Sequence, residues 1–352
     1  MIDRNLALKV KSLMPSRERD TDGSRPVSMW NEMDRLRGKP EETAVVIFRT
    51  RGCSWYDFSS CSMCGYFNDV NTRVTVDDLK KQIDRAYEFM ERTKILKVFT
   101  SGSFLDRREM PLEAYEYFLK KMSDRIEYLL VESRTEYVTS ETMKSLKNYG
   151  IGVRIAIGVE STDDEVIKKS VNKGSTFSKF KAAADVVNRN DLELRSYLLL
   201  KPPFMPEEEA VQDAIKSVND CAPYSKDVSV NPMNIQKNTL VEKLWKQGLY
   251  RPPWLYSICR VLLDTRNSGT EVLSYPTGGD RERGSHNDNR DGELVKLIFK
   301  SSLEQNFTDL ERYYNSQDRS LYEAHLRLES GLPVQYNTDS FLRKMSTGAV
   351  QI

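Results

Sequence analysis

Between about residue 44 and residue 240, short apolar segments alternate with amphipathic ones. The apolar segments are rich in Val, Ile and Leu and end in polar or glycine-rich residues, which is typical of buried parallel strands. The amphipathic segments between them have the length and apolar spacing of helices. This alternation predicts an α/β fold, an open (partial) parallel β/α barrel of about six βα units. The six expected strands cover residues 43–50, 95–104, 126–136, 152–162, 193–204 and 227–235.

The alternation is absent from both flanks, so we divide the chain into three parts. Residues 1–43 are polar and charged, and we interpret them as an N-terminal helical brace with helices near 5–13 and 27–38. Residues 44–240 are the predicted barrel core. Residues 241–352 combine helical segments, one strand and a glycine-rich loop, and we expect a smaller α+β C-terminal extension that contacts substrate or a partner.

Composition and charge exclude several classes of protein. The chain has 352 residues, of which 39% are hydrophobic and 30% charged, so it can build a core and does not resemble a disordered protein. No apolar run approaches the ~18 residues of a membrane span, and the N-terminal segment lacks a signal-peptide pattern. We therefore expect a cytoplasmic protein. Its formal net charge is +1, so a nucleic-acid partner requires a local basic face.

Polar residues gather where the expected strands end. The carboxyl ends of parallel strands meet at one mouth of a β/α barrel, and chemistry in such barrels occurs at that mouth. We therefore expect these strand-end residues to lie together, although each could alone be an ordinary turn or surface residue. They are Cys53, Ser101, Gly102, Ser103, Glu132, Ser133, Arg134, Glu160, Lys201 and Asn231.

Three of the five cysteines lie in one short segment with the spacing C-x7-C-x2-C, at Cys53, Cys61 and Cys64. A structural zinc site needs four Cys or His ligands, and the only histidines, His286 and His325, are distant in sequence. A redox-active cysteine pair needs only two sulfurs. A [4Fe–4S] cluster held by three thiolates leaves one iron open to a small ligand, and a loop at a barrel mouth suits it.

The chain is similar to the archaeal radical S-adenosylmethionine (SAM) family of archaeosine tRNA modification, the beta subunits of archaeosine synthase (RaSEA). The similarity extends from about Trp30 to about His286. The radical domain is also similar to that of the Elongator catalytic subunit, although we find no counterpart of its acetyltransferase domain. The seven-residue gap departs from the commonest superfamily spacing, C-x3-C-x2-C. The similar segments are "RTRGCSWYDFSSCSMCGYFND", "TSGSFLD", "ESRTEYV", "IGVES", "VNKG", "NPMNIQKNTLVEKLW" and "YRPPWLYS".

This resemblance implies two cofactors, a [4Fe–4S] cluster and SAM. It assigns Cys53, Cys61 and Cys64 as cluster ligands, with the amino and carboxylate groups of SAM on the open iron. The turn at 101–103 would meet the methionine amino group, and the strand-end carboxylates and guanidinium would hold other polar groups of SAM or substrate. An arginine inside an apolar strand needs an anionic partner, and the SAM carboxylate is our candidate for it. The residues expected to bind SAM are Tyr66, Ser101, Gly102, Ser103, Glu132, Arg134, Glu160 and Arg195.

The resemblance also implies a reaction on tRNA. An ArcS-type archaeosine synthase alpha subunit would first attach lysine to 7-cyano-7-deazaguanine in tRNA. The radical enzyme would then cleave the carbon–nitrogen bond of this adduct and leave the formamidine of archaeosine. The expected partners are tRNA, the alpha subunit and an electron donor, with no membrane. Alternatives are another radical SAM tRNA-modifying reaction (Elongator-like, alkylating or thiolating) or a non-catalytic iron–sulfur RNA-binding protein.

Candidate RNA contacts are basic residues with aromatic neighbours, although the same charges also suit a solvated helix face. They are Lys168, Lys169, Lys173, Lys237, Arg251, Arg281 and Arg283, with Tyr250, Trp254 and Tyr256 for packing or stacking.

Overall fold

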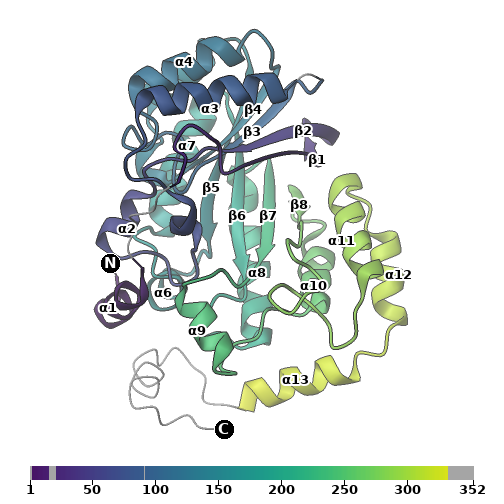
Figure 1. Cartoon of the computed structure of the whole chain (residues 1–352). Coiled ribbons are helices and arrows are strands. Elements are labelled where there is room, and N and C mark those ends of the chain that lie inside the picture. The colour runs from purple at the N-terminus through teal and green to yellow at the C-terminus, as the bar shows by residue number, and fades with distance from the viewer. Residues whose placement is uncertain (1, 16–20, 91, 332–352) are drawn as a thin grey trace.

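The computed structural model describes residues 2–15, 21–90 and 92–331. Within these residues, eight strands form one curled sheet in the order β1 to β8 (Figure 1). β1 and β2 pair antiparallel, and each later strand is parallel to its predecessor. This mostly parallel half-barrel confirms the predicted fold class. The strands are β1 (Ser28–Leu36), β2 (Lys39–Ile47), β3 (Ile95–Phe99), β4 (Tyr128–Ser133), β5 (Gly152–Glu160), β6 (Glu193–Leu200), β7 (Asp227–Pro232) and β8 (Glu271–Leu273).

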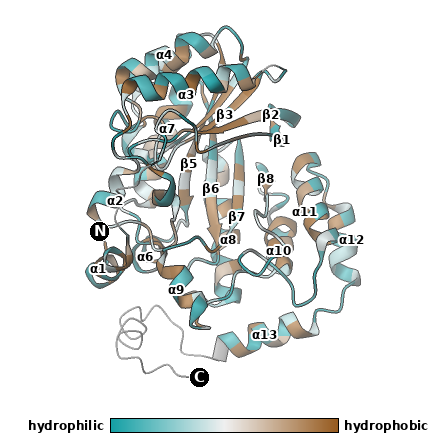
Figure 2. Cartoon of the chain, in the orientation of Figure 1, coloured by the Kyte–Doolittle hydropathy of each residue, from teal (hydrophilic) through white to brown (hydrophobic). Residues whose placement is uncertain are grey.

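Helices cover the outer face of the sheet (Figure 1), and apolar residues recur along both the strands and the helices that cover them (Figure 2). Strand residues such as Val98, Leu129 and Ile155 share one buried core with helix residues such as Ile83 and Phe118. The helices are α1 (Arg4–Leu13), α2 (Ser54–Phe58), α3 (Val76–Phe89), α4 (Leu112–Met122), α5 (Ser140–Lys147), α6 (Asp164–Val166), α7 (Phe177–Arg189), α8 (Glu207–Cys221), α9 (Leu240–Lys246), α10 (Leu255–Thr265), α11 (Gly292–Glu304), α12 (Thr308–Ser316) and α13 (Ser320–Gly331).

The interior of the half-barrel carries charges near the amino ends of its strands. Lys97 and Arg195 both contact the Asp34 carboxylate, at 2.6 Å and 2.7 Å, and Arg195 also contacts Asp227 at 2.6 Å. Arg154 pairs with Asp227 as well, and all five residues are almost fully buried. A buried charge is tolerated only when it is paired, so this network closes that end of the barrel with ion pairs instead of apolar packing.

The expectation of a helix at residues 27–38 is wrong, because Ser28–Leu36 forms strand β1. Along this strand Glu32 and Asp34 point toward the interior and contact Lys97, while Leu36 joins a small inner cluster of apolar residues. The inward positions of β1 are therefore partly charged, and the period-two alternation that marks a strand is hidden. The helical brace is limited to α1.

The last third of the chain completes the sheet instead of standing apart from it. β8 pairs with β7, with Asp227 opposite Glu271, and α10 packs against α8 on the outer face. Residues 332–352 of the expected C-terminal extension lie outside the described residues. No helix in the described part of the chain has the length and apolar character needed to cross a bilayer.

Candidate functional site

The three clustered cysteines follow the carboxyl end of β2. Cys53 is the N-cap of α2, and Cys61 and Cys64 lie in the loop after that helix. All three are free thiols and partly exposed, whereas the other two, Cys221 and Cys259, are buried in the outer core. The protein environment raises the pKa of the Cys61 thiol to about 12 by desolvation, and it raises the pKa of Cys53 in the same way. The thiolate is the form that binds a metal, so ligation at these desolvated sulfurs would need a thiophilic metal to supply the positive charge that stabilises it.

The seven-residue gap between Cys53 and Cys61 is a fixed helical segment. Asn172, in the connection between β5 and α7, donates from its amide to the Ser59 hydroxyl and the Ser60 carbonyl, both at 2.7 Å. The carbonyl of Asn172 accepts a 3.0 Å hydrogen bond from the Trp55 indole. Phe58, by contrast, leaves 76% of its surface exposed. Asn172 was not predicted as a site residue, because its role depends on contacts more than a hundred positions away in sequence.

The turn at residues 101–103 lies against the first cysteine, as its strand-end position predicts. A Cβ atom on Gly102 would lie 2.7 Å from Cys53 Cβ and 2.4 Å from Glu109 Oε1, so only glycine fits there without movement. Glu109 itself accepts from the Ser103 amide at 2.7 Å and from the Thr50 hydroxyl at 2.7 Å. This buried carboxylate therefore joins the end of β2 to the turn after β3, and sequence reasoning missed it.

Two cations lie beside the cysteines. Arg134 Nη1 is 3.7 Å from Cys53 Sγ, and Arg134 opposes the desolvation that raises the pKa of this thiol. Lys173 contacts Glu160 at 2.7 Å and donates to the Gly158 carbonyl at 2.5 Å. Glu160 ends β5 with a positive φ of 67°, which is strained for a residue with a side chain. Positive charge next to thiolates favours metal ligation because it offsets their repulsion.

The other predicted SAM contacts at this edge are Glu132 and Tyr66. Burial raises the pKa of Glu132 to about 8, although Lys97 and Lys173 oppose this shift, and its carboxylate has no hydrogen bond or ion pair among the described residues. Tyr66 is 52% exposed, and its carbonyl accepts from the Ser101 hydroxyl at 3.4 Å. The preceding amide, of Gly65, donates to Gln236 Oε1 at 2.5 Å, which links the cysteine loop to the segment after β7. Glu132 and Tyr66 therefore lie at the same edge as the cysteines, and their contact with SAM stays a prediction.

Arg195 does not belong to this edge. It is near the start of β6, is 1% exposed, and is engaged by Asp34 and Asp227 in the interior network. Because strand starts lie at the end of the barrel opposite the cysteines, the geometry does not support a SAM carboxylate contact, and we leave Arg195 out of the proposed site.

The predicted aromatic RNA contacts are also unsupported. Tyr250, Trp254 and Tyr256 are 9%, 3% and 8% exposed, and the Arg251 guanidinium stacks on Trp254 at 4.0 Å. Rings packed in this way present no face to a base. The basic candidates differ in environment, since Lys237 and Arg281 are exposed whereas Lys168, Lys169, Lys173 and Arg283 contact carboxylates.

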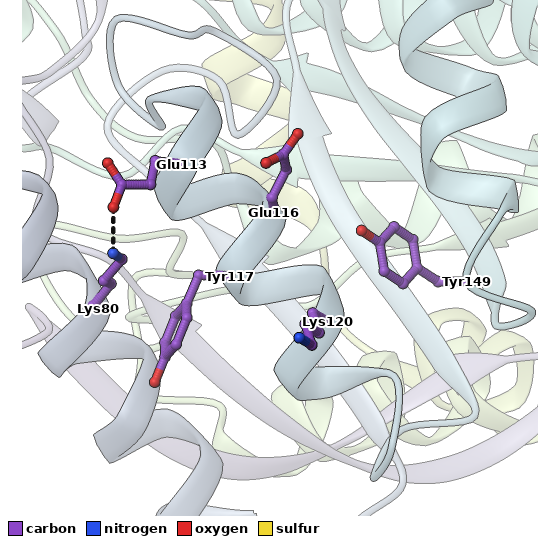
Figure 3. Close-up of a pocket in the computed structure, with 6 residues that line it drawn as sticks. All are labelled: Lys80, Glu113, Glu116, Tyr117, Lys120 and Tyr149. Atoms are coloured by element: carbon purple, nitrogen blue, oxygen red, sulfur yellow. Dashed lines mark hydrogen bonds and ion pairs between the residues drawn. The ribbon is translucent and has the colours of Figure 1, made fainter.

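A carboxylate–histidine cluster and a surface pocket resemble functional sites, but neither supports a functional assignment. Within the described residues, one set of His, Cys, Asp or Glu has ligand atoms all within 4.8 Å, namely Glu207, His325 and Glu329, and it does not include the cysteines. Lys201 already supplies a cation there, 2.6 Å from Glu207 and 3.3 Å from Glu329. A pocket between α3 and α4 lies on the helical outer face, and no predicted site residue lines it (Figure 3). Its lining residues are Lys80, Glu113, Glu116, Tyr117, Lys120 and Tyr149.

Comparisons with known proteins place the chain in a family. Residues 47–214 match the radical SAM superfamily. The chain is 36% identical over 324 residues to archaeosine synthase subunit beta of Methanosarcina acetivorans, covering 88% of this chain and 93% of that protein. It is 35% identical over 298 residues to archaeosine synthase subunit beta of Thermococcus kodakarensis, covering 81% and 92%. The solved structure of archaeal Methanocaldococcus infernus Elp3 with an N-terminal deletion matches at 15% identity and a TM-score of 0.49, over 74% of this chain and 63% of that one.

Proposed function

Because this chain belongs to the archaeosine synthase subunit beta family of radical SAM enzymes, we propose that it completes archaeosine in tRNA by cleaving a carbon–nitrogen bond. The substrate is the lysine adduct of 7-cyano-7-deazaguanine in tRNA. The observation that carries the proposal is the position of Cys53, Cys61 and Cys64, three free thiols on one loop at the carboxyl edge of a half-barrel. A radical SAM enzyme needs such a loop.

The residues present fit the two cofactors that the family implies, a [4Fe–4S] cluster and SAM. The three cysteines are cluster ligands in this proposal, and three thiolates leave one iron open. The turn at 101–103 would contact the methionine part of SAM, since Gly102 holds this turn directly against Cys53. Tyr66, Glu132 and Glu160 provide further polar contacts to SAM or to an ammonium group of the substrate.

When bound at these residues, the two cofactors would supply radical hydrogen-atom abstraction next to the substrate nitrogen. In the net reaction, the bond between the lysine side-chain carbon and its nitrogen breaks, and the nitrogen stays on the base as the formamidine. The carbon leaves as a semialdehyde with its oxygen from water. SAM is the oxidant and yields methionine, 5′-deoxyadenosine and a proton. The protein binds and orients the cofactors and the substrate at the edge of the sheet. It also excludes bulk water there, because reactive intermediates must be protected from side reactions.

We place this activity in the cytoplasm, with tRNA as substrate, an ArcS-type alpha subunit as the preceding enzyme and a separate electron donor. The names of the two relatives support a multi-subunit context. The modified base lies within folded tRNA, so the RNA has to present it outward to the barrel edge.

The test is anaerobic incubation of lysine-adduct tRNA with reconstituted protein, SAM and a reductant, followed by mass spectrometry of nucleosides and small molecules. We expect archaeosine, the lysine-derived semialdehyde and 5′-deoxyadenosine in equal amounts. Cys61→Ala should lose cluster iron and all three products. Cys259→Ala is the matched control, since this thiol is buried in the outer core and should leave product yields unchanged.

Two outcomes would contradict the proposal in different ways. If SAM is cleaved while the tRNA mass stays constant or rises by an alkyl or sulfur increment, the substrate or reaction is wrong. If wild-type protein binds four irons per chain but never cleaves SAM, a non-catalytic iron–sulfur RNA-binding protein is the better interpretation.

A further inference from the structure

We propose that Arg134 tunes the reduction potential of the cluster through a hydrogen bond to the Cys53 sulfur, and that Glu136 limits this effect by sharing the arginine's charge. The inference rests on the cluster assignment made under the proposed function. It gives Arg134 a role different from the SAM contact expected from the sequence, and it makes Arg134 a positioning residue that acts through a cluster ligand.

The two terminal nitrogens of the Arg134 guanidinium contact different groups, a cysteine sulfur and a carboxylate. Arg134 Nη1 lies 3.7 Å from Cys53 Sγ, a normal distance for a hydrogen bond to sulfur, and Nη2 lies 2.5 Å from Glu136 Oε1. The arginine side chain is only 13% exposed, whereas that of Glu136 is 42% exposed. The charge is therefore held close to the thiol in a partly desolvated place, where electrostatic effects are stronger than at the surface.

The surroundings hold Arg134 in this position. Its backbone amide donates to the Ser103 hydroxyl at 2.9 Å, which fixes the end of β4 to the turn beside Cys53. The guanidinium also lies 5.5 Å from the centre of the Trp55 ring, and Trp55 is itself anchored by Asn172. The cation is thus fixed from two sides relative to Cys53.

The chemical consequence follows from charge. Reduction adds one negative charge to a cluster, and a hydrogen bond from a cation to a ligand sulfur stabilises the reduced form more than the oxidised form. Loss of the arginine should therefore lower the reduction potential. Loss of the Glu136 carboxylate should raise it, because the arginine is then no longer neutralised.

The chain contains a matched ion pair for comparison. Arg108 contacts Asp57 of helix α2 at 2.8 Å, with side chains that are 63% and 39% exposed. Asp57 lies between Cys53 and Cys61, and Arg108, in the loop between β3 and α4, donates to the Asp57 carboxylate instead of to a cysteine sulfur. Arg108→Gln and Asp57→Asn therefore control for charge removal near the cluster.

The experiment uses the full chain, reconstituted anaerobically without SAM or tRNA, and follows the reduced cluster by electron paramagnetic resonance during potentiometric titration. Arg134→Gln should lower the reduced-to-oxidised ratio at the wild-type midpoint at least tenfold, equivalent to about 59 mV for a one-electron couple. Arg134→Lys should recover part of this loss. Glu136→Gln should raise the ratio about threefold, and the two control variants should change it less than twofold.

The possible results separate the alternatives. An unchanged SAM-free potential in Arg134→Gln together with weaker SAM binding would assign Arg134 to SAM and overturn the inference. If Arg134→Gln does not retain the cluster, Glu136→Gln decides, because a shift no larger than that of Asp57→Asn overturns the inference. Wild-type protein that binds no cluster would refute the cluster assignment and the inference together. Absence of archaeosine with normal shifts would refute only the proposed reaction.

Discussion

Replacing Gly102 by alanine should disturb the first cysteine more than any other small substitution at this edge. The added Cβ would lie 2.7 Å from Cys53 Cβ, 2.8 Å from Cys53 Cα and 2.4 Å from Glu109 Oε1. Glu109 cannot easily withdraw, because its carboxylate is buried and bonded to Ser103 and Thr50. The strain must therefore be relieved largely by displacement of Cys53.

The size of this displacement follows from the contact distances. To reach ordinary contact at 3.4 Å, the two Cβ atoms must separate by about 0.7 Å. Ligand distances in metal sites tolerate only about ±0.2 Å, so a shift of this size should weaken ligation by Cys53. Overpacking of a buried site typically costs about 1–3 kcal/mol of stability. Cluster retention should thus fall even though most of the protein stays folded.

Two measurements test this reasoning. Urea unfolding of the apo protein should show a loss of about 1–3 kcal/mol for Gly102→Ala. Iron and sulfide analysis after anaerobic reconstitution should give less than half of the wild-type content. Gly292→Ala, whose nearest neighbour atom is 4.0 Å away, is the matched control and should retain both properties.

The reasoning is refuted if Gly102→Ala binds as much iron as the wild type with the same spectrum and unfolds at the same urea concentration. A loss of stability without loss of iron would show that the strain is absorbed by Glu109, and would remove the argument that Gly102 positions Cys53.

Three further substitutions test other parts of the structure. Arg195→Met should lower the free energy of unfolding by about 3–5 kcal/mol in urea denaturation, because it leaves buried carboxylates unpaired. Arg108→Gln removes an exposed arginine and should cost less than ~1 kcal/mol. Equal effects of the two substitutions would contradict the buried network. Asn172→Ala should accelerate amide hydrogen exchange in residues 54–62, and unchanged exchange there would show that the gap is held by other contacts. Burial raises the pKa of Glu329, but His325 and other partners lower it to about 2 overall. The ionised Glu329 therefore stabilises the folded protein by on the order of 3 kcal/mol. This contribution is present above about pH 4.5 and is lost as the pH falls toward 2. Glu329→Gln and wild type should therefore differ in urea unfolding at pH 6 and converge near pH 2, and a difference independent of pH would contradict this.

The sequence was informative wherever a residue's role depends on its position along one strand. Six strands were located because apolar runs of this kind have few other structures available, and the polar residues at their ends do reach one edge. The structure does not support Arg195 as a SAM contact, and its position along the strand already indicated this. Arg195 lies at the start of its strand and not at the end, so it faces the opposite end of the barrel.

Roles that depend on distant partners could not be predicted in this way. β1 was missed because its inward residues are acidic, and their partners Lys97 and Arg195 come from other strands. Glu109 was missed for the same reason, since its contacts with Thr50 and Ser103 exist only after β2 and β3 have paired. Such long-range contacts leave no periodic signal in one sequence.

The seven-residue gap between Cys53 and Cys61 acquires a physical meaning from these contacts. Its helix places the Trp55 ring where a Cβ on Gly174 would meet it at 2.5 Å, and Asn172 binds the end of the same gap. The neighbouring Lys173 holds Glu160 at the end of β5. One short connection therefore fixes both the cysteine loop and the β5 side of the candidate SAM site. A change in gap length would require a matching change at residues 172–174, so we expect these two segments to be exchangeable between relatives only together.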